Sequence, residues 1–316
     1  MSSAYPFRLI DHQKAPLEDL EILRRRPFTE LARTFKDDAE LFDPGDDLET
    51  AMNTALAVGL PLLVTGEPGT GKTQAAYYAA WKLGTGDVLH FQVKSDSTAR
   101  DLLYSFDTVS YFHDAHLPGA GDLKDKTKYR TRRELWEALA SPHPRVVLID
   151  EIDKAPRDFP NDLLHELDKM EFTVRETGEE VRETAAMRPI VFITSNSERR
   201  LPEPFLRRCV YHHIEFDENL VRRVVEVRRQ RGEYKSLSEE FLRLALQRFL
   251  ELRGRSLRKP PATGELLVWL RVLALAAGVH PATLDEKDLS KLPYLGVLLK
   301  DHEDMEGLRL AKGRSA

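Results

Sequence analysis

Three glycines and a lysine separate an apolar run from a helix-like run in the segment LLVTGEPGTGKTQAA, residues 62–76. Eight consecutive residues match the pattern G-x-x-x-x-G-K-[ST], and they are Gly66, Glu67, Pro68, Gly69, Thr70, Gly71, Lys72 and Thr73. Glycines let the backbone curl so that N–H groups point at phosphate oxygens, and the following helix adds its positive N-terminus. We therefore expect Lys72 to reach the β and γ phosphates of a nucleotide and Thr73 to bind Mg²⁺. A simple glycine turn, the alternative, would need neither flanking run.

A second apolar run, RVVLID in residues 145–150, ends in the acidic pair Asp150 and Glu151. One carboxylate at the end of a strand can hold Mg²⁺ through water, and its neighbour can orient and deprotonate an attacking water. An acidic pair after a strand is common by itself, but its position downstream of Lys72 in the same alternating region makes it informative. The alternative is that these acids and Asp153 cap a helix.

The third candidate group begins at the end of another apolar run, FITSN in residues 192–196. Asn196 closes this run and is placed to bridge the attacking water and the γ-phosphate. Further on, Arg207 and Arg208 form a pair near the expected edge of the domain, where an arginine can act as a finger on a neighbouring subunit. The alternatives are an asparagine that starts a turn and an arginine pair in surface or interface salt bridges.

The elements that must position these side chains are short apolar runs separated by helix-like segments. Strands that alternate with helices predict a parallel sheet, and burial on both faces explains why the runs are continuous. The predicted strands are 60–66, 88–93, 145–150, 189–196 and, more weakly, 210–216. We therefore expect an α/β fold.

The domain organisation follows from where this alternation begins and ends. From about residue 218 onward the spacing of apolar residues is helical, which predicts a small all-helical domain. We expect an N-terminal extension at 1–40, an α/β nucleotide-binding domain at 41–217, a helical domain at 218–302 and a flexible tail at 303–316. Between the third and fourth strands, residues 171–185 predict a charged hairpin that turns at Thr177 and Gly178.

Composition limits the function classes. The chain has 316 residues, a net charge of -5 and one cysteine, Cys209. The acidic balance argues against a protein dominated by nucleic-acid phosphate contacts, and one cysteine allows no intramolecular disulfide, as in a reducing cytoplasm. The N-terminal residues show no secretory leader and no run of about 18 apolar residues occurs, so we expect a cytoplasmic location and no membrane insertion.

Together the three motifs resemble those of the AAA+ ATPases, over roughly residues 41–300. TSN followed by LPEPFLRR is typical of that superfamily. The segment DEIDKAPRDFPNDLLHELDKMEFTVRETG is most similar to the MoxR branch, in the helix-2-insert grouping with a hairpin in the helix after the acidic motif, here 172–184. The resemblance implies a P-loop core with a five-stranded parallel sheet flanked by helices, followed by a helical lid, with the strand ending at Asn196 between the strands ending at Gly66 and Asp150.

The resemblance also implies roles for single residues. Asp150 corresponds to the metal-positioning acid, Glu151 to the catalytic base and Asn196 to sensor 1. Arg208 aligns with the finger, and Arg207 stands where the family often has an acid, so either arginine or both can serve.

The expected lid departs from the family pattern. Thr263 aligns with the arginine called sensor 2. Arg258, Lys259 or Arg271 can substitute for it, or the role is lost.

The implied function is an Mg²⁺-dependent ATPase that forms a homo-oligomeric ring, most often a hexamer. It would remodel or activate a protein partner that carries a von Willebrand factor A domain. We further hypothesise that residues 172–185 face the pore and engage a client. A nucleotide-gated scaffold in signalling or defence is an alternative, which Glu151 disfavours and Thr263 favours. A nucleic-acid motor is disfavoured because this hairpin is acidic and Phe172 is its one aromatic residue.

Overall fold

The computed structural model describes residues 10, 21–24, 34–115, 125–183, 188–276, 282–285 and 288–311. It divides into two compact units. An α/β unit spans Pro44–Glu215, and a helical unit combines Phe216–Ala316 with the N-terminal residues up to Asp43. The predicted residues Thr184 and Ala185 of the hairpin, and most of the N-terminal extension, lie outside the described residues.

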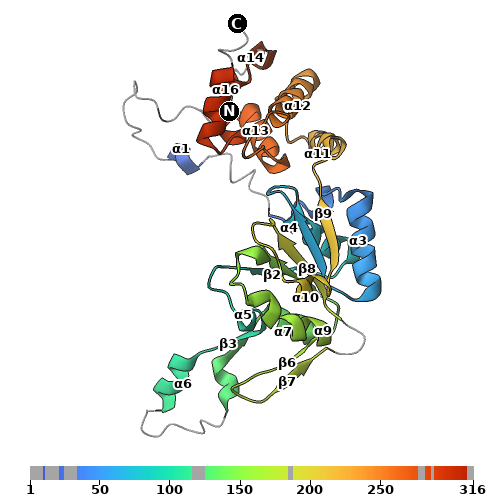
Figure 1. Ribbon diagram of the computed structural model, residues 1–316, viewed down its shortest axis with the longest axis vertical. Helices are drawn as coiled ribbons and strands as arrows, with labels where there is room; N and C mark the ends of the chain where they lie inside the picture. Colours follow the sequence, from blue (N-terminus) through green and yellow to red (C-terminus); the bar gives the residue numbers. More distant parts are fainter. Residues whose placement is uncertain are drawn as a thin grey trace. The chain divides into compact units, whose positions relative to one another are not determined.

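A five-stranded parallel sheet forms the centre of the α/β unit, in the order β2-β5-β8-β1-β9 (Figure 1). All five predicted strands are confirmed, and β8 lies between β1 and β5. The strands are β1 (Leu62–Gly66), β2 (Leu89–Gln92), β5 (Val146–Asp150), β8 (Ile190–Ser195) and β9 (Val210–Ile214).

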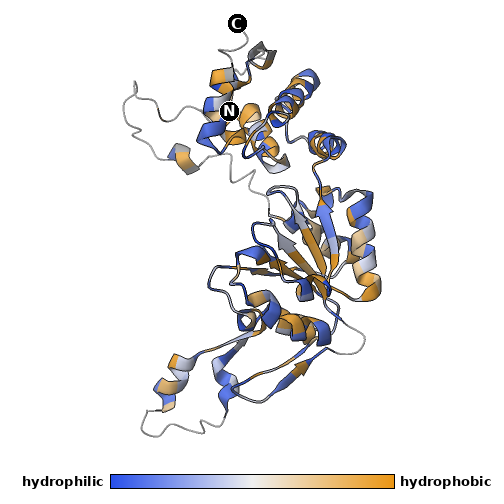
Figure 2. Cartoon of the chain, viewed as in Figure 1, coloured by the Kyte–Doolittle hydropathy of each residue, from blue (hydrophilic) through white to orange (hydrophobic). Residues whose placement is uncertain are grey.

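Burial on both faces accounts for the apolar strands. Every residue of β1 and β5 is buried, and hydrophobic residues lie along the strands in Figure 2. Three helices pack on the sheet: α3 (Gly45–Val58) on β9 and β1, α4 (Lys72–Leu83) on β5 and β1, and α7 (Glu134–Leu139) on β2 and β5. Because the strands are parallel, their carboxyl ends share one edge of the sheet, which positions the site.

The predicted hairpin is confirmed for its described residues. Strands β6 (Glu171–Thr173) and β7 (Glu180–Arg182) pair antiparallel, and the N–H groups of Thr177 and Gly178 donate to the carbonyl of Val174. Gly178 has φ +71°, a conformation that favours glycine. Phe172, however, is only 5% exposed, and it packs in the main hydrophobic core with the buried side chains of Val174 and Val181. Phe172 is therefore part of the core, and the role of residues 172–185 in engaging a client stays a prediction.

A second hairpin precedes β5 and was not predicted. Strands β3 (Tyr104–Phe106) and β4 (Arg130–Arg132) pair antiparallel, and helix α6 (Thr108–Ala115) lies between them in the sequence. Each strand has only three residues and no apolar run, so no strand pattern could be recognised in the sequence. The other short elements of this unit are α5 (Ala99–Leu103), η2 (Lys126–Tyr129), η3 (Ile152–Lys154), α8 (Phe159–Asp162), α9 (Leu164–Lys169) and α10 (Glu203–Leu206).

The helical unit has its own core. Its longer helices are α11 (Glu218–Gln230), α12 (Glu239–Arg253), α13 (Thr263–Leu275) and α16 (His302–Ala311). The shorter elements are α1 (Glu21–Arg24), η1 (Ala39–Leu41), α14 (Ala282–Asp285), η4 (Leu289–Lys291) and α15 (Leu295–Leu298). Helix α16 corrects the expectation of a flexible tail, because its Asp304 is buried and accepts the backbone N–H groups of Arg258 and Lys259.

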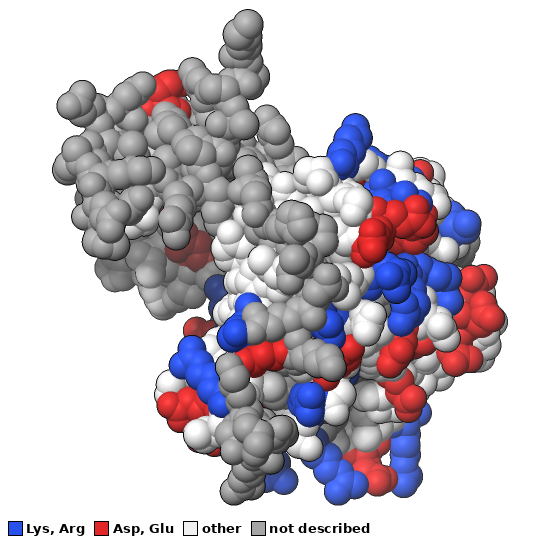
Figure 3. All heavy atoms as spheres, turned by 90° about the horizontal axis from the view of Figure 1, so that it is seen from above, with Lys and Arg blue, Asp and Glu red and all other residues white. Residues whose placement is uncertain are grey.

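Ion pairs attach the residues before Asp43 to helix α11 of the same unit. Arg228 contacts Asp38 at 2.9 Å, and Arg231 contacts Glu40 at 2.8 Å. The described basic and acidic residues in Figure 3 are interspersed rather than gathered into a field of one sign. Among the described helices, none is long and apolar enough to cross a membrane.

Candidate active site

The glycine-rich loop joins β1 to α4 at the carboxyl edge of the sheet. Gly66 has φ +148°, and a Cβ added there would lie 2.8 Å from the carbonyl oxygen of Ile214. Gly71 precedes the first residue of α4 and has φ +97°. Both positions require glycine, so the loop can curl over the N-terminus of a 12-residue helix, a geometry that favours an anion.

Lys72 is the first residue of α4, directly after this loop, and is 5% exposed. Its Nζ donates to the carbonyl oxygens of Gly66 at 3.0 Å and Glu67 at 2.8 Å. Burial lowers the pKa of Lys72, while the nearby carboxylates of Asp153 and Asp150 oppose that shift. The ammonium group is thus held in the loop that the sequence predicts to surround phosphates.

Asp150 lies at the end of β5, where three side chains converge on it. The hydroxyl groups of Thr73 and Thr194 donate to its carboxylate at 3.0 and 2.5 Å, and His90 Nε2 lies 3.2 Å from it. Burial by itself would raise the pKa of Asp150, but the hydrogen bonds from His90, Thr194 and Thr73 lower it overall. The carboxylate therefore stays ionised beside the Thr73 hydroxyl.

The oxygen atoms of Thr73 and Asp150 suit Mg²⁺, a hard cation that usually takes one or two protein carboxylates together with phosphate oxygens and water. Among the described residues, no group of three or more His, Cys, Asp or Glu side chains is placed to hold a metal ion. Thr73 and Asp150 would hold a magnesium ion together with phosphate oxygens and water.

Glu151 has a left-handed backbone, with φ +60°. Its carboxylate accepts hydrogen bonds from Gln92 at 2.8 Å, Lys154 at 2.6 Å and Asn196 Nδ2 at 3.3 Å. The structure thus brings the predicted base and the predicted sensor into contact. It also shows that two further donors hold the base.

Asp153 has a different role from the helix capping considered above. It is 3% exposed, and its carboxylate accepts the backbone N–H groups of Asn196 at 3.3 Å and Glu198 at 3.0 Å. Asp153 therefore fixes the loop after β8, and with it the position of Asn196 beside Glu151.

The two candidate finger arginines differ in what they contact. Arg208 donates to the carboxylate of Asp168 and, at 2.9 Å, to the carbonyl of Pro204. Arg207 has an 80% exposed side chain and one exposed contact, with Glu203 at 3.2 Å. Arg207 is thus the more available of the two. Cys209 follows Arg208, and burial raises the pKa of its thiol to about 12, which disfavours the nucleophilic thiolate.

Residues 61–209 match the profile of a family described as AAA domain (dynein-related subfamily). This part of the chain, just under half of its length, is similar to that family. No curated protein matches the chain.

Two solved structures resemble the chain at low identity. NtrX from Brucella abortus, in complex with ADP, has a TM-score of 0.51 and 14% identity, covering 93% of this chain and 65% of that one. The Hsp104–ADP complex of S. cerevisiae has a TM-score of 0.45 and 19% identity, covering 81% of this chain and 49% of that one. The chain therefore spans less than two thirds of either protein, and the likeness to NtrX supports the fold alone.

The candidate active site uses polar residues that the sequence analysis missed. His90 and Gln92 alternate in a strand whose other residues are apolar, so they lie on one face of β2, next to β5. The polar residues at alternate positions of the run 88–93 could have indicated that one face of this strand contributes to the site. Thr194 and Lys154 gave no comparable signal, because hydroxyl groups in strands and lysines after acids are common.

The lid residues considered as sensor 2 belong to the helical unit. Arg258 contacts Glu303 at 2.7 Å, and Arg271 contacts Glu233 at 3.3 Å. Thr263 begins helix α13. Lys259 is exposed. Both arginines are thus engaged within their own unit.

Proposed function

We propose that this chain is an Mg²⁺-dependent ATPase. One observation carries the proposal: the carboxyl edge of the sheet brings Thr73 within 3.0 Å of Asp150 and Asn196 within 3.3 Å of Glu151, beside the lysine-bearing loop. Phosphoryl transfer needs mainly positioning and charge stabilisation, and this arrangement supplies a cation for phosphates, hard oxygen ligands and a carboxylate base.

Each residue has a defined task. Lys72 and the N–H groups of the loop bind the phosphates of ATP. Thr73 and Asp150 hold Mg²⁺, which when bound neutralises developing charge on phosphate oxygens. Asn196 orients the attacking water, and Glu151 accepts its proton once its carboxylate is released from Lys154 and Gln92.

The decisive experiment measures ATP hydrolysis per chain against protein concentration with Mg²⁺, for the natural protein and Lys72→Ala. We expect hydrolysis that Lys72→Ala abolishes and a rate per chain that rises with concentration to a plateau, because sites are completed between subunits. A rate that stays unchanged in Lys72→Ala would contradict the site. A flat rate from a protein of monomer mass would contradict assembly but not the ATPase activity.

The finer parts of the proposal concern assembly and partner. We propose a ring, hexameric as in the MoxR branch, in which the exposed Arg207 reaches the site of a neighbouring copy. The ring would act in the cytoplasm on a protein partner with a von Willebrand factor A domain. These features rest on the motif resemblance, and the exposure of Arg207 supports a contact in trans.

A nucleotide-gated scaffold is the second candidate, and the contacts of Glu151 favour it. A base held at 2.6 Å by Lys154 and at 2.8 Å by Gln92 is restrained from accepting a proton. If these contacts suppress turnover, Lys154→Ala should raise the hydrolysis rate, whereas the exposed control Lys169→Ala should leave it unchanged. No increase in Lys154→Ala would remove the support for this second function.

A further inference from the structure

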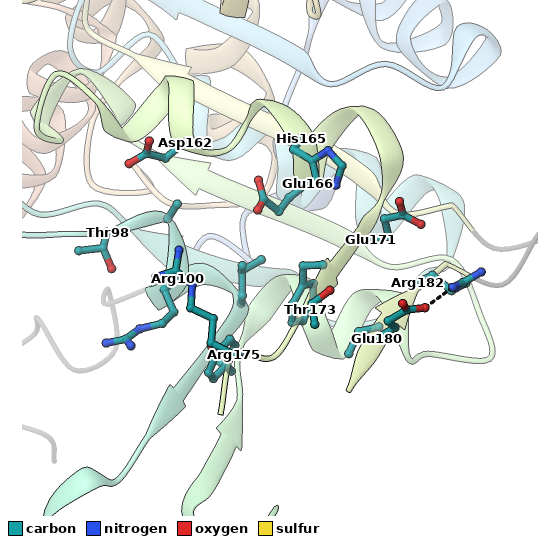
Figure 4. Close-up of a pocket in the computed structure, with 15 residues that line it drawn as sticks. Thr98, Arg100, Asp162, His165, Glu166, Glu171, Thr173, Arg175, Glu180 and Arg182 are labelled. Carbon is teal, nitrogen blue, oxygen red and sulfur yellow. Dashed lines mark hydrogen bonds and ion pairs between the residues drawn. The ribbon is translucent and has the colours of Figure 1, made fainter. Parts of the chain in front are cut away.

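A cavity of about 620 Å³ lies in the α/β unit and shares no lining residue with the candidate active site. Its walls come from the start of α5, from α8 and α9, and from both strands of the β6–β7 hairpin. In Figure 4, Asp162, His165 and Glu166 project from α8 and α9, and Arg100 and Arg175 lie across the space from them.

The floor of this cavity is built from packed aromatic side chains. Tyr104 stacks on Phe172 with ring centroids 6.2 Å apart, and Trp136 packs edge-on against both rings. The Tyr104 hydroxyl donates to Glu176 at 2.8 Å and accepts the backbone N–H of Arg175 at 3.1 Å. The β3–β4 and β6–β7 hairpins are thereby fixed to each other, so the cavity is a formed feature of the fold.

The charges around the cavity are unequally paired. Arg182 pairs with Glu180 at 2.5 Å, and Arg100 lies 3.6 Å from Glu176. The other charged lining residues make no side-chain hydrogen bond or ion pair with another described residue, and they are Asp162, Glu166, Glu171 and Arg175. With the paired residues included, four carboxylates and three guanidinium groups line the cavity, which leaves a small excess of negative charge in a preformed space.

Glu166 is the most informative of these residues. Its Oε2 atom is buried and has no hydrogen-bond partner, and burial raises the pKa of its carboxyl group. An unsatisfied buried carboxylate costs stability, and a neutral side chain of the same shape would avoid most of that cost. A donor that enters the cavity from outside would satisfy this oxygen and offset the excess charge.

We propose that this cavity binds a basic side chain, lysine or arginine, presented by a protein partner, with Glu166 as its acceptor. The stem of such a side chain packs on Tyr104 and Phe172, while its charged end reaches the carboxylate. The volume exceeds that of one side chain, so the neighbouring residues of the partner also fit. Since binding requires no hydrolysis, its failure would leave the proposed ATPase activity untouched.

The test is calorimetric titration of the full chain with the peptide acetyl-Gly-Arg-Gly-amide, and with acetyl-Gly-Glu-Gly-amide as the opposite charge. We expect the arginine peptide to bind and Glu166→Gln to weaken that binding at least about tenfold, because a charge-assisted hydrogen bond is lost. The matched control Glu137→Gln, at an exposed position on α7, should bind as the natural protein does.

A melting temperature of Glu166→Gln equal to or above that of the natural protein shows that a loss of binding is not misfolding. Three results would overturn the proposal. They are no binding of the arginine peptide by the natural protein up to about 10 mM, equal binding by Glu166→Gln, or preferential binding of the glutamate peptide. The last result would assign recognition to Arg175 and an acidic partner.

Discussion

The active-site edge and the hairpin cavity both gather carboxylates, but they treat them in opposite ways. At the edge of the sheet, Asp150, Glu151 and Asp153 each accept at least two hydrogen bonds from the chain itself. In the cavity, Glu166 has a buried oxygen without a partner. Carboxylates with partners are positioned in advance for chemistry, whereas a carboxylate without one is left for a group that arrives from outside.

The two arginines after α10 also differ in whether the chain holds their side chains. Replacing the exposed one should give the largest loss of hydrolysis among the variants. Arg208 is held by Asp168 and Pro204, whereas Arg207 is exposed. If Arg207 is the finger, Arg207→Ala should lower the rate of ATP hydrolysis about 10³–10⁵-fold, as measured at saturating ATP.

A mixing experiment distinguishes a finger in trans from a local defect. Arg207→Ala and Glu151→Gln should each be inactive alone and should regain activity when mixed, because mixed rings contain sites with an intact base and an intact finger. Activity that stays absent in the mixture would contradict the assignment of Arg207, and the same experiment with Arg208→Ala would then test its neighbour.

Replacing Glu151 tests whether a carboxylate that the chain holds in position acts as the catalytic base. Glu151→Gln keeps the shape and the contact with Asn196 but cannot accept a proton, so we expect hydrolysis to fall by about 10²–10⁴-fold with ATP binding retained. Stopped-flow binding of a fluorescent ATP analogue, compared with steady-state hydrolysis, separates the two steps. A parallel loss of binding would mean that Glu151 organises the site rather than the proton transfer.

Replacing Asp153 and Glu166 by their amides should have different effects on stability. Because Asp153 accepts two backbone N–H groups from the loop after β8, Asp153→Asn should destabilise the fold by about 1–3 kcal/mol, as urea unfolding would measure. Glu166→Gln should leave stability equal or higher. If both variants behave alike, the distinction between satisfied and unsatisfied carboxylates fails.

The smallest expected effect is the pH dependence of that stability difference. Burial raises the pKa of Glu166 overall, although the hydrogen bond from its own backbone N–H and the charges of His165 and Arg175 oppose the rise. A carboxyl group whose pKa is raised on folding destabilises the protein above that pKa and ceases to do so once pH falls below its unfolded pKa. Any advantage of Glu166→Gln should therefore be present at pH 7–8 and vanish near pH 4. Melting curves of both proteins across this pH range measure the difference in stability. A stability advantage of Glu166→Gln that grows as pH falls would contradict a raised pKa of Glu166.

Local signals in the chain were enough to predict much of the molecule. The motif Gly66–Thr73 can be recognised from its own residues, the strand before it and the helix after it. The acidic pair Asp150–Glu151 can be recognised from its place at the end of a buried strand. Strands buried on both faces produce continuous apolar runs, so β1, β5 and β8 could be read directly, whereas the partly exposed β9 gave a weaker signal. The β3–β4 hairpin could not, because three-residue strands carry too few residues to show a period.

The burial of Phe172 could not be predicted, for a related reason. An aromatic residue in a charged hairpin looks available, and only its stacking on Tyr104, from a hairpin far away in the sequence, shows that it is buried. Burial of a side chain by a distant segment leaves no trace in its own neighbourhood of the sequence.

The sequence by itself determined the phosphate-binding loop, the acidic pair and the parallel sheet, because each depends on residues that are close together in the chain. The tertiary structure decided which donors hold Glu151, how Asp153 fixes Asn196, and where the cavity around Glu166 lies. Those features join β2, β5 and β8, or two separate hairpins, and contacts between distant segments depend on packing that no local pattern specifies.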